Sequence, residues 1–146
     1  MNDGAFISLR STVLGSECDH MGHMNVRHYV GKFDDATWNF FNRIGLTPSF
    51  FRDSDRGMAA VEMHIEYKAE LLVGDVITIT TRLLEVKPKA IIFRHDMYNG
   101  ETGQHAASMN AVAVHLDSVR RRAVAFSDEL KAKMDAVQRE DSQISS

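Results

Sequence analysis

The sequence is short of several features that mark whole classes of protein. It contains a single cysteine, Cys18, so no disulfide can form within the chain. The net charge is -3, from 17 basic and 20 acidic residues, which leaves no positive excess to attract nucleic acid. Residues 1–4 lack the basic segment and apolar run of a signal peptide, and no stretch approaches the roughly 18 apolar residues of a membrane span. These absences favour a cytoplasmic protein with neither nucleic-acid nor membrane partners.

The composition that remains is typical of one folded domain. Of the 146 residues, 44% are hydrophobic and 25% are charged, which is ordinary for a globular protein with a substantial core. The chain shows no internal repeat and no linker between domains. We therefore expect a single domain over residues 1–138, followed by a polar, disordered tail over residues 139–146.

A long helix is predicted over residues 26–44, because its apolar residues recur at spacings of three and four. They are Val26, Tyr29, Val30, Phe33, Ala36, Trp38, Phe40, Phe41 and Ile44. Asn25 is a suitable N-cap, and Gly45 can end the helix because glycine enters the left-handed region cheaply. A second helix is expected over residues 128–138, capped by Ser127. Between them, residues 46–53 are interpreted as a connection broken by Pro48.

Five strands are predicted, over residues 6–14, 58–68, 76–86, 90–98 and 104–116. In the second, apolar and polar residues alternate, which predicts one face in the core and the other in solvent or against a partner. Its apolar residues are Val61, Met63, Ile65 and Tyr67. In the last strand, Ala107, Ala111 and Ala113 form a face small enough for a helix to lie close. The order of elements predicts an α+β fold with an antiparallel sheet curled around the long helix.

The stretch before the long helix carries the candidate chemistry. A helix N-terminus presents free N–H groups and partial positive charge, which can polarise a carbonyl oxygen that becomes an oxyanion. Asp19 lies six residues before Asn25, so its carboxylate can face the same space. A carboxylate beside a polarising helix end predicts a hydrolytic site. The alternative is an aspartate that only binds the backbone of its own turn.

Three motifs in order carry a resemblance to a known family. The first is Asp19-x-x-Gly22-His23-x-Asn25-x-x-x-Tyr29 at the start of the long helix. The second runs from Ile65 through Tyr67 and Leu71 to Gly74-Asp75, and the third is Thr102-Gly103 before an alanine-rich strand. Over residues 6–130 the chain resembles the hot-dog-fold acyl-CoA thioesterases, in particular their 4-hydroxybenzoyl-CoA thioesterase-like branch.

The resemblance implies a hot-dog fold, in which a curved five-stranded antiparallel sheet wraps one central helix, here with an extra C-terminal helix. It implies dimers whose sheets join edge to edge, often paired into tetramers, with the active site between protomers. Asp19 aligns with the carboxylate that acts as nucleophile or general base, and the Val26 N–H aligns with the donor to the thioester carbonyl. Relatives with aryl-CoA substrates carry an aromatic residue or proline just before the helix. This chain has Met24-Asn25 there, so the acyl preference does not transfer.

The remaining candidates have two interpretations each. His23 and Asn25 can orient water or the thioester, or lock the loop. Gly22 and Tyr29 are candidates for substrate binding. Gly22 permits close backbone approach, and Tyr29 is expected on the buried face of the helix. Coenzyme A phosphates are expected on basic side chains, for which solvated loop charge is the alternative. The candidates are Lys87, Lys89 and Arg120.

The loop and the long helix contain other residues that could act in catalysis. Cys18 is more typical of a small buried residue than of a nucleophile. The spacing of Asp19, His20 and His23 matches no standard zinc pattern, so no metal is expected, and coenzyme A enters only as part of the substrate. Some relatives place the catalytic carboxylate on the long helix, which keeps Asp34 and Asp35 as alternatives.

The sequence therefore predicts a thioesterase that converts an acyl-CoA and water into free acid and coenzyme A. Two alternatives remain. One is a non-catalytic acyl-CoA-binding hot-dog protein, in which Asp19 is structural. The other is a hot-dog dehydratase, which needs a His–Asp pair for proton abstraction from carbon, and no matching motif is visible.

Overall fold

The computed structural model describes residues 4–144. Two parts of the predictions lie outside the described residues: residues 1–3 of the predicted domain and residues 145–146 of the predicted tail. The elements are β1 (Phe6–Thr12), the 3₁₀ helix η1 (Gly15–Glu17), α1 (Val26–Arg43), α2 (Pro48–Asp53), β2 (Arg56–Tyr67), β3 (Val76–Val86), β4 (Ala90–Asn99), β5 (His105–Asp117), β6 (Arg122–Ala123) and α3 (Asp128–Ser142).

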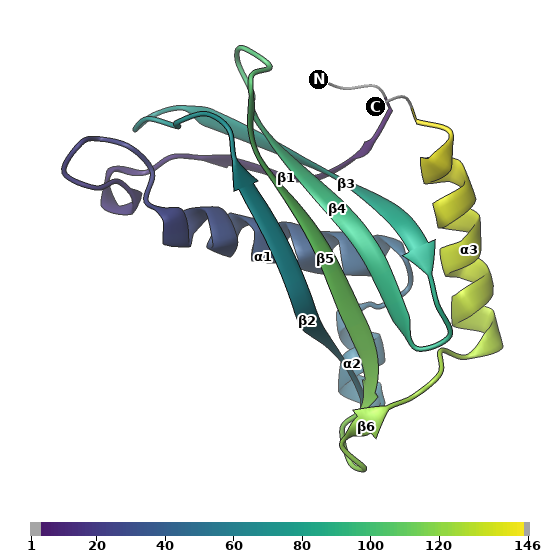
Figure 1. Cartoon of the computed structure of the whole chain (residues 1–146). Coiled ribbons are helices and arrows are strands. Elements are labelled where there is room, and N and C mark those ends of the chain that lie inside the picture. The colour runs from purple at the N-terminus through teal and green to yellow at the C-terminus, as the bar shows by residue number, and fades with distance from the viewer. Residues whose placement is uncertain (1–3, 145–146) are drawn as a thin grey trace.

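One antiparallel sheet, in the order β1-β3-β4-β5-β2, curls around α1 (Figure 1). This confirms the predicted α+β fold and the predicted hot-dog arrangement. The two-residue strand β6 pairs with the end of β5 and was not predicted, since it is too short to give a periodic pattern. Because β2 is hydrogen-bonded only to β5, it forms one edge of the sheet.

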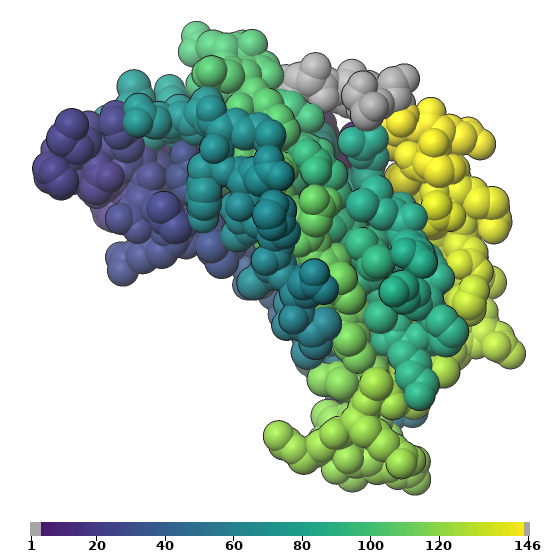
Figure 2. Space-filling model, in the orientation of Figure 1, coloured from purple at the N-terminus to yellow at the C-terminus, as the bar shows by residue number. Residues whose placement is uncertain are grey.

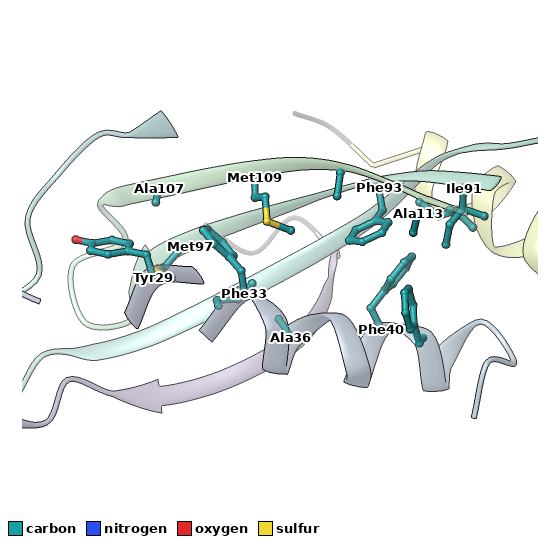
Figure 3. Packing of buried hydrophobic residues seen from close by; sticks show 14 of the residues in the cluster. Tyr29, Phe33, Ala36, Phe40, Ile91, Phe93, Met97, Ala107, Met109 and Ala113 are labelled. Atoms are coloured by element: carbon teal, nitrogen blue, oxygen red, sulfur yellow. The ribbon is translucent and has the colours of Figure 1, made fainter. Parts of the chain in front are cut away.

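The long helix begins and ends where the sequence predicts. The Asn25 side chain accepts a hydrogen bond from the Arg27 N–H, and Gly45 follows the helix with φ +98°, in the left-handed region. Phe33, Ala36 and Phe40 point from α1 toward the sheet and are fully buried (Figure 3). The opposing face of β5 is made of small side chains and one methionine: Ala107, Met109, Ala111 and Ala113.

Three of the four alternating apolar residues of β2 are exposed, which is a difference from the prediction, whereas Ile65 is half-buried and packs against the core. Val61 is 62% exposed, Met63 52% and Tyr67 47%. The strand lies at the edge of the sheet, and its register with β5 shifts between Ala60 and Glu62. Periodicity identified the strand correctly, but it cannot tell whether an apolar face packs inside one chain.

Two helices differ from the prediction. Residues 48–53 form α2 rather than a loop, because Pro48 occupies the first turn, where its missing N–H costs nothing, and the Thr47 side chain caps Phe50. Residues 139–142, expected in a disordered tail, are the last turn of α3. The reason is Asp141, which is only 2% exposed because it is held by other elements.

Asp141 attaches α3 to the open edge of β3. Its carboxylate accepts two hydrogen bonds of 3.0 Å from the Arg43 guanidinium and one of 2.9 Å from the Leu83 N–H. Strand β1 pairs with β3 only from Val76 to Thr81, so Leu83 has no strand neighbour on that side. The carboxylate therefore takes the place of a missing strand, and α3 covers the exposed part of the edge.

Asp141→Ala should lower the free energy of unfolding by about 3 kcal/mol, because it leaves a partly buried guanidinium and a buried N–H unpaired. Chemical denaturation followed by far-UV circular dichroism measures this. The matched control is Glu140→Ala, since Glu140 is exposed and lies 3.9 Å from Arg43; its cost should stay below about 0.5 kcal/mol. Equal losses for the two variants would contradict the assigned role of Asp141.

A polar cluster lies inside the core, between α1 and the sheet. His95 is fully buried, with Nε2 2.8 Å from the Thr37 hydroxyl and Nδ1 2.6 Å from the Thr81 hydroxyl. Thr81 in turn donates to the Ser8 hydroxyl at 2.7 Å. The Thr37 hydroxyl also donates to the Phe33 carbonyl at 2.9 Å, so it can accept from the Nε2–H of a neutral imidazole. Burial lowers the pKa of His95 to about 3, so the ring is uncharged at neutral pH.

This low pKa makes stability fall in acid. Above pH 6.5 neither the folded nor the unfolded state protonates His95, and below it only the unfolded state takes up the proton. From pH 7 to pH 5 the protein should lose about 2 kcal/mol of stability through His95 alone. Denaturation at both pH values, compared with His95→Gln, isolates this contribution. An unchanged pH dependence in the variant would show that the imidazole is protonated in the folded state.

Candidate active site

The loop before α1 is a small hairpin docked on a neighbouring segment. Cys18 and Met24 form an isolated antiparallel bridge, and the Asp19 N–H donates to the His23 carbonyl at 2.9 Å. Gly22 turns the chain with φ +80°. The Met24 N–H donates to the Leu71 carbonyl at 2.8 Å, so the loop is fixed to the chain before β3.

Asp19 begins the turn at the closed end of this hairpin, where its carbonyl accepts a hydrogen bond from the Gly22 N–H at 3.0 Å. Its Oδ1 accepts hydrogen bonds from the backbone N–H groups of Met21, at 2.9 Å, and His23, at 3.3 Å. The structural interpretation of Asp19 as a turn residue therefore holds for one oxygen. Oδ2 has no hydrogen-bond or ion-pair partner in the described part of the chain, and the side chain is exposed. The turn thus orients the carboxylate while it leaves one oxygen able to contact a ligand.

A nearby ion pair anchors η1 to α1. The Lys32 ammonium, almost completely buried, lies 3.1 Å from Glu17 and donates to the Ser11 hydroxyl and the Thr12 carbonyl. Burial alone would raise the pKa of Glu17, but the Leu14 N–H and Lys32 outweigh it, so the pKa lies below its usual value. The loop therefore enters the helix at a fixed angle.

The other loop candidates have local partners. His23 Nε2 lies 3.2 Å from the Glu70 carboxylate, so the ring points toward the segment before β3. Asn25 caps α1. Tyr29 is buried, as expected, and its hydroxyl donates to the Ala69 carbonyl at 3.4 Å. As the first residue of α1, Val26 has an N–H with no partner inside the helix, beside the hairpin that carries Asp19.

The structure does not bring the basic candidates to Asp19 within one chain. Lys87 and Lys89 lie in the turn between β3 and β4, and Arg120 lies in the turn between β5 and β6. Both turns are at the opposite end of the sheet from the hairpin (Figure 1). Any shared site for these residues and Asp19 requires a second protomer.

A cavity that the sequence analysis missed lies between α1 and the β2 side of the sheet. We call it the α1–β2 groove, and its volume is about 460 Å³. The sheet side is lined by Met58, Ala60, Met63, Met109, Ala111 and Ala113. The helix side contains Arg27, Asp34, Thr37 and Trp38. The space-filling view shows a concave outline between the loop end of the molecule and the β6 end (Figure 2).

A signal for the groove was present in the sequence. Arg27, Asp34 and Trp38 follow spacings of seven and four on α1, in a stripe beside the buried one. Asp34 has no hydrogen-bond or ion-pair partner among residues 4–144. Trp38 is 54% exposed and packs edge to face with Phe41 and Phe51, at centroid distances of 6.1 and 5.8 Å. An exposed tryptophan beside a free carboxylate marks a binding surface more often than a core.

Within residues 4–144, no three histidine, cysteine, aspartate or glutamate side chains are grouped so that they could hold a metal ion. None of the helices in that range has both the length and the apolar character needed to cross a bilayer.

Comparison with known proteins places the chain in a family. The model of the thioesterase-like superfamily matches residues 13–134, so the chain belongs to that superfamily. The L-carnitine dehydrogenase/betainyl-CoA thioesterase of Agrobacterium fabrum is 32% identical over 84% of this chain and 25% of its own length. The chain thus spans about a quarter of that relative. The long-chain acyl-CoA thioesterase of Escherichia coli is 27% identical over 84% of this chain and 92% of its own length.

The fold has close counterparts among solved structures. A hypothetical protein of Staphylococcus aureus, solved in complex with CoA, superposes with a TM-score of 0.90 at 23% identity. The match covers 100% of this chain and 91% of the other. At this identity the likeness establishes the fold, which agrees with the curled sheet and C-terminal helix described above.

Proposed function

We propose that this protein hydrolyses an acyl-CoA thioester to free acid and coenzyme A. The observation that carries the proposal is the free Oδ2 of Asp19 beside the N-terminus of α1. Membership of the thioesterase-like superfamily supports it, as do relatives whose names include betainyl-CoA and long-chain acyl-CoA thioesterase.

The chemistry needs few groups. Asp19 acts as general base: it takes a proton from water while the water oxygen bonds to the thioester carbon. The carbonyl oxygen becomes an oxyanion, which the Val26 N–H and the helix dipole stabilise. The C–S bond then breaks, and the coenzyme A thiolate leaves. Direct attack by Asp19 through an acyl-enzyme anhydride is the alternative route.

We further propose that two protomers build the site by pairing their β2 edges. Support comes from the unpaired edge and from the apolar residues exposed on it. Antiparallel pairing of two β2 strands brings the Arg56 end of one beside the Tyr67 end of the other. Tyr67 contacts Tyr29 near the Asp19 hairpin, whereas Asp117 binds both Arg56 and the Arg120 N–H. Arg120 of one protomer then approaches the other protomer's site, where coenzyme A phosphates need a cation.

Asp19→Asn tests the catalytic role. The amide keeps an oxygen for the Met21 and His23 N–H groups, so the loop should keep its shape, but it is no base. Thiol release from a panel of acyl-CoAs should fall by at least about a hundredfold, with unchanged circular dichroism. Asp53→Asn, an exposed site at the end of α2 and outside the groove, is the control and should retain activity.

Two outcomes would redirect the proposal. Full activity in Asp19→Asn moves the catalytic carboxylate to α1, as the sequence alternative allows. No turnover of any ester by the unmodified protein, with binding of the same esters, supports the non-catalytic acyl-CoA-binding protein instead.

The β2 pairing has its own test. Val61→Lys places a charge on the exposed edge strand and should convert the dimer to a monomer, because paired strands would bring two lysines together. Light scattering during gel filtration measures the mass. Leu84→Lys, on the exposed part of β3, is the control and should leave the dimer intact. A dimer that persists in Val61→Lys would place the interface elsewhere.

A further inference from the structure

The charges along the α1–β2 groove have a definite order. The positive end of the helix and the Arg27 guanidinium lie at one end, and the Asp34 carboxylate lies seven residues further along. At 1.5 Å per residue the two side chains leave the helix about 10 Å apart along its axis. The groove between them is walled by methionine, alanine and aromatic side chains. One end thus suits an anion or an oxyanion, and the other suits a cation.

We propose that the groove binds an acyl group bearing a permanently charged alkylammonium, with Asp34 and Trp38 as its recognition residues. This inference rests on the proposed thioester hydrolysis for the identity of the ligand. The carboxylate supplies charge, and the indole face attracts a quaternary ammonium through its quadrupole. The methionine and alanine side chains contact the methyl groups, which accept no hydrogen bonds.

The alternative occupant is a long, uncharged acyl chain. Such a chain gains binding free energy when it is buried against apolar side chains. It would, however, remove water from the Asp34 carboxylate, which no residue within 4–144 neutralises. A cationic head group removes this penalty because it pairs with the carboxylate. The lining therefore favours a charged acyl group over an alkyl chain of the same length.

The position of Asp34 sets an approximate length. It lies eight residues beyond Val26, about 12 Å along the helix axis, and helical side chains lean back toward the N-terminus. An acyl group with three methylenes between carbonyl and nitrogen reaches further toward Asp34 than one with a single methylene. We expect the longer cation to depend more strongly on Asp34.

The experiment uses two pairs of CoA esters that differ only in charge. One pair is betainyl-CoA and 3,3-dimethylbutyryl-CoA; the other is 4-trimethylammoniobutyryl-CoA and 5,5-dimethylhexanoyl-CoA. In each pair a carbon atom replaces the quaternary nitrogen and keeps its shape. The value of kcat/KM for thiol release is measured with the full chain, with Asp34→Asn and with the control Asp53→Asn, at an exposed carboxylate outside the groove.

The cationic ester of each pair should be preferred. In Asp34→Asn, kcat/KM for the cationic esters should fall about tenfold or more, while the values for the neutral esters stay equal or rise. The inference is overturned by equal rates within both pairs in the unmodified protein. It is also overturned by an equal loss for cationic and neutral esters in Asp34→Asn, since that pattern marks a general catalytic carboxylate.

A binding measurement separates this inference from the proposed hydrolysis. Trp38 is the only tryptophan in the chain, so its fluorescence reports occupancy of the groove. Titration of the Asp19→Asn protein with all four esters should show tighter binding of the cations, and this preference should be lost in the Asp19→Asn, Asp34→Asn double variant. If the unmodified protein hydrolyses no ester, the hydrolytic proposal fails, and the titration still decides the ligand class. Equal affinity for the cationic and the neutral ester within both pairs would contradict the inference that the groove binds a cationic acyl group.

Discussion

The close packing of α1 against the concave face of the sheet is the constraint on which the rest of the molecule depends. Phe33 and Phe40 fill the space between helix and sheet, and β5 opposes them with a row of small side chains. Larger residues on β5 would move the helix outward, because protein interiors have little free volume. The depth of α1 fixes where its N-terminus emerges and how wide a groove remains beside β2. Fold and candidate site are therefore consequences of one packing arrangement.

The loop that carries Asp19 adds a second, local constraint. The Asp19 hairpin is attached to Leu71 on one side, and the buried ion pair of Lys32 with Glu17 joins its base to α1. Neither contact involves the free oxygen of Asp19. Such an arrangement holds a carboxylate near a helix end without using up its ability to accept a proton. It also separates positioning from chemistry, since the groups that hold the loop are not the groups that would touch a thioester.

Local patterns predicted most of the fold because their causes are local. The caps at Asn25 and Ser127 and the helix end at Gly45 depend on neighbours within a few residues, and each appears where expected. The end of α3 could not be predicted in this way. Asp141 looks like a surface residue in sequence, but it pairs with Arg43, 98 residues away. The burial of β2 could not be predicted for the same reason: the alternation is present, but Val61 and Met63 stay exposed because no other element of the described chain covers them.

The same difference between local and tertiary causes applies to the residues of the candidate site. Asp19 and Val26 could be identified because loop, cap and helix start are contiguous in sequence. Lys87, Lys89 and Arg120 could be chosen only by charge, and the structure places them at the other end of the sheet. The groove was missed because its walls come from α1, β2 and β5, whose separation is set by tertiary packing. The sequence alone suggests Asp34 only as a rival base. Asp34 lies in the middle of α1, eight residues after Val26. Under the proposal above, this position gives it a different relation to a thioester: the dipole of α1 attracts the carbonyl oxygen at one end of the groove, and the carboxylate attracts positive charge at the other. A ligand with both features satisfies both ends at once, whereas a plain alkyl chain satisfies only the first.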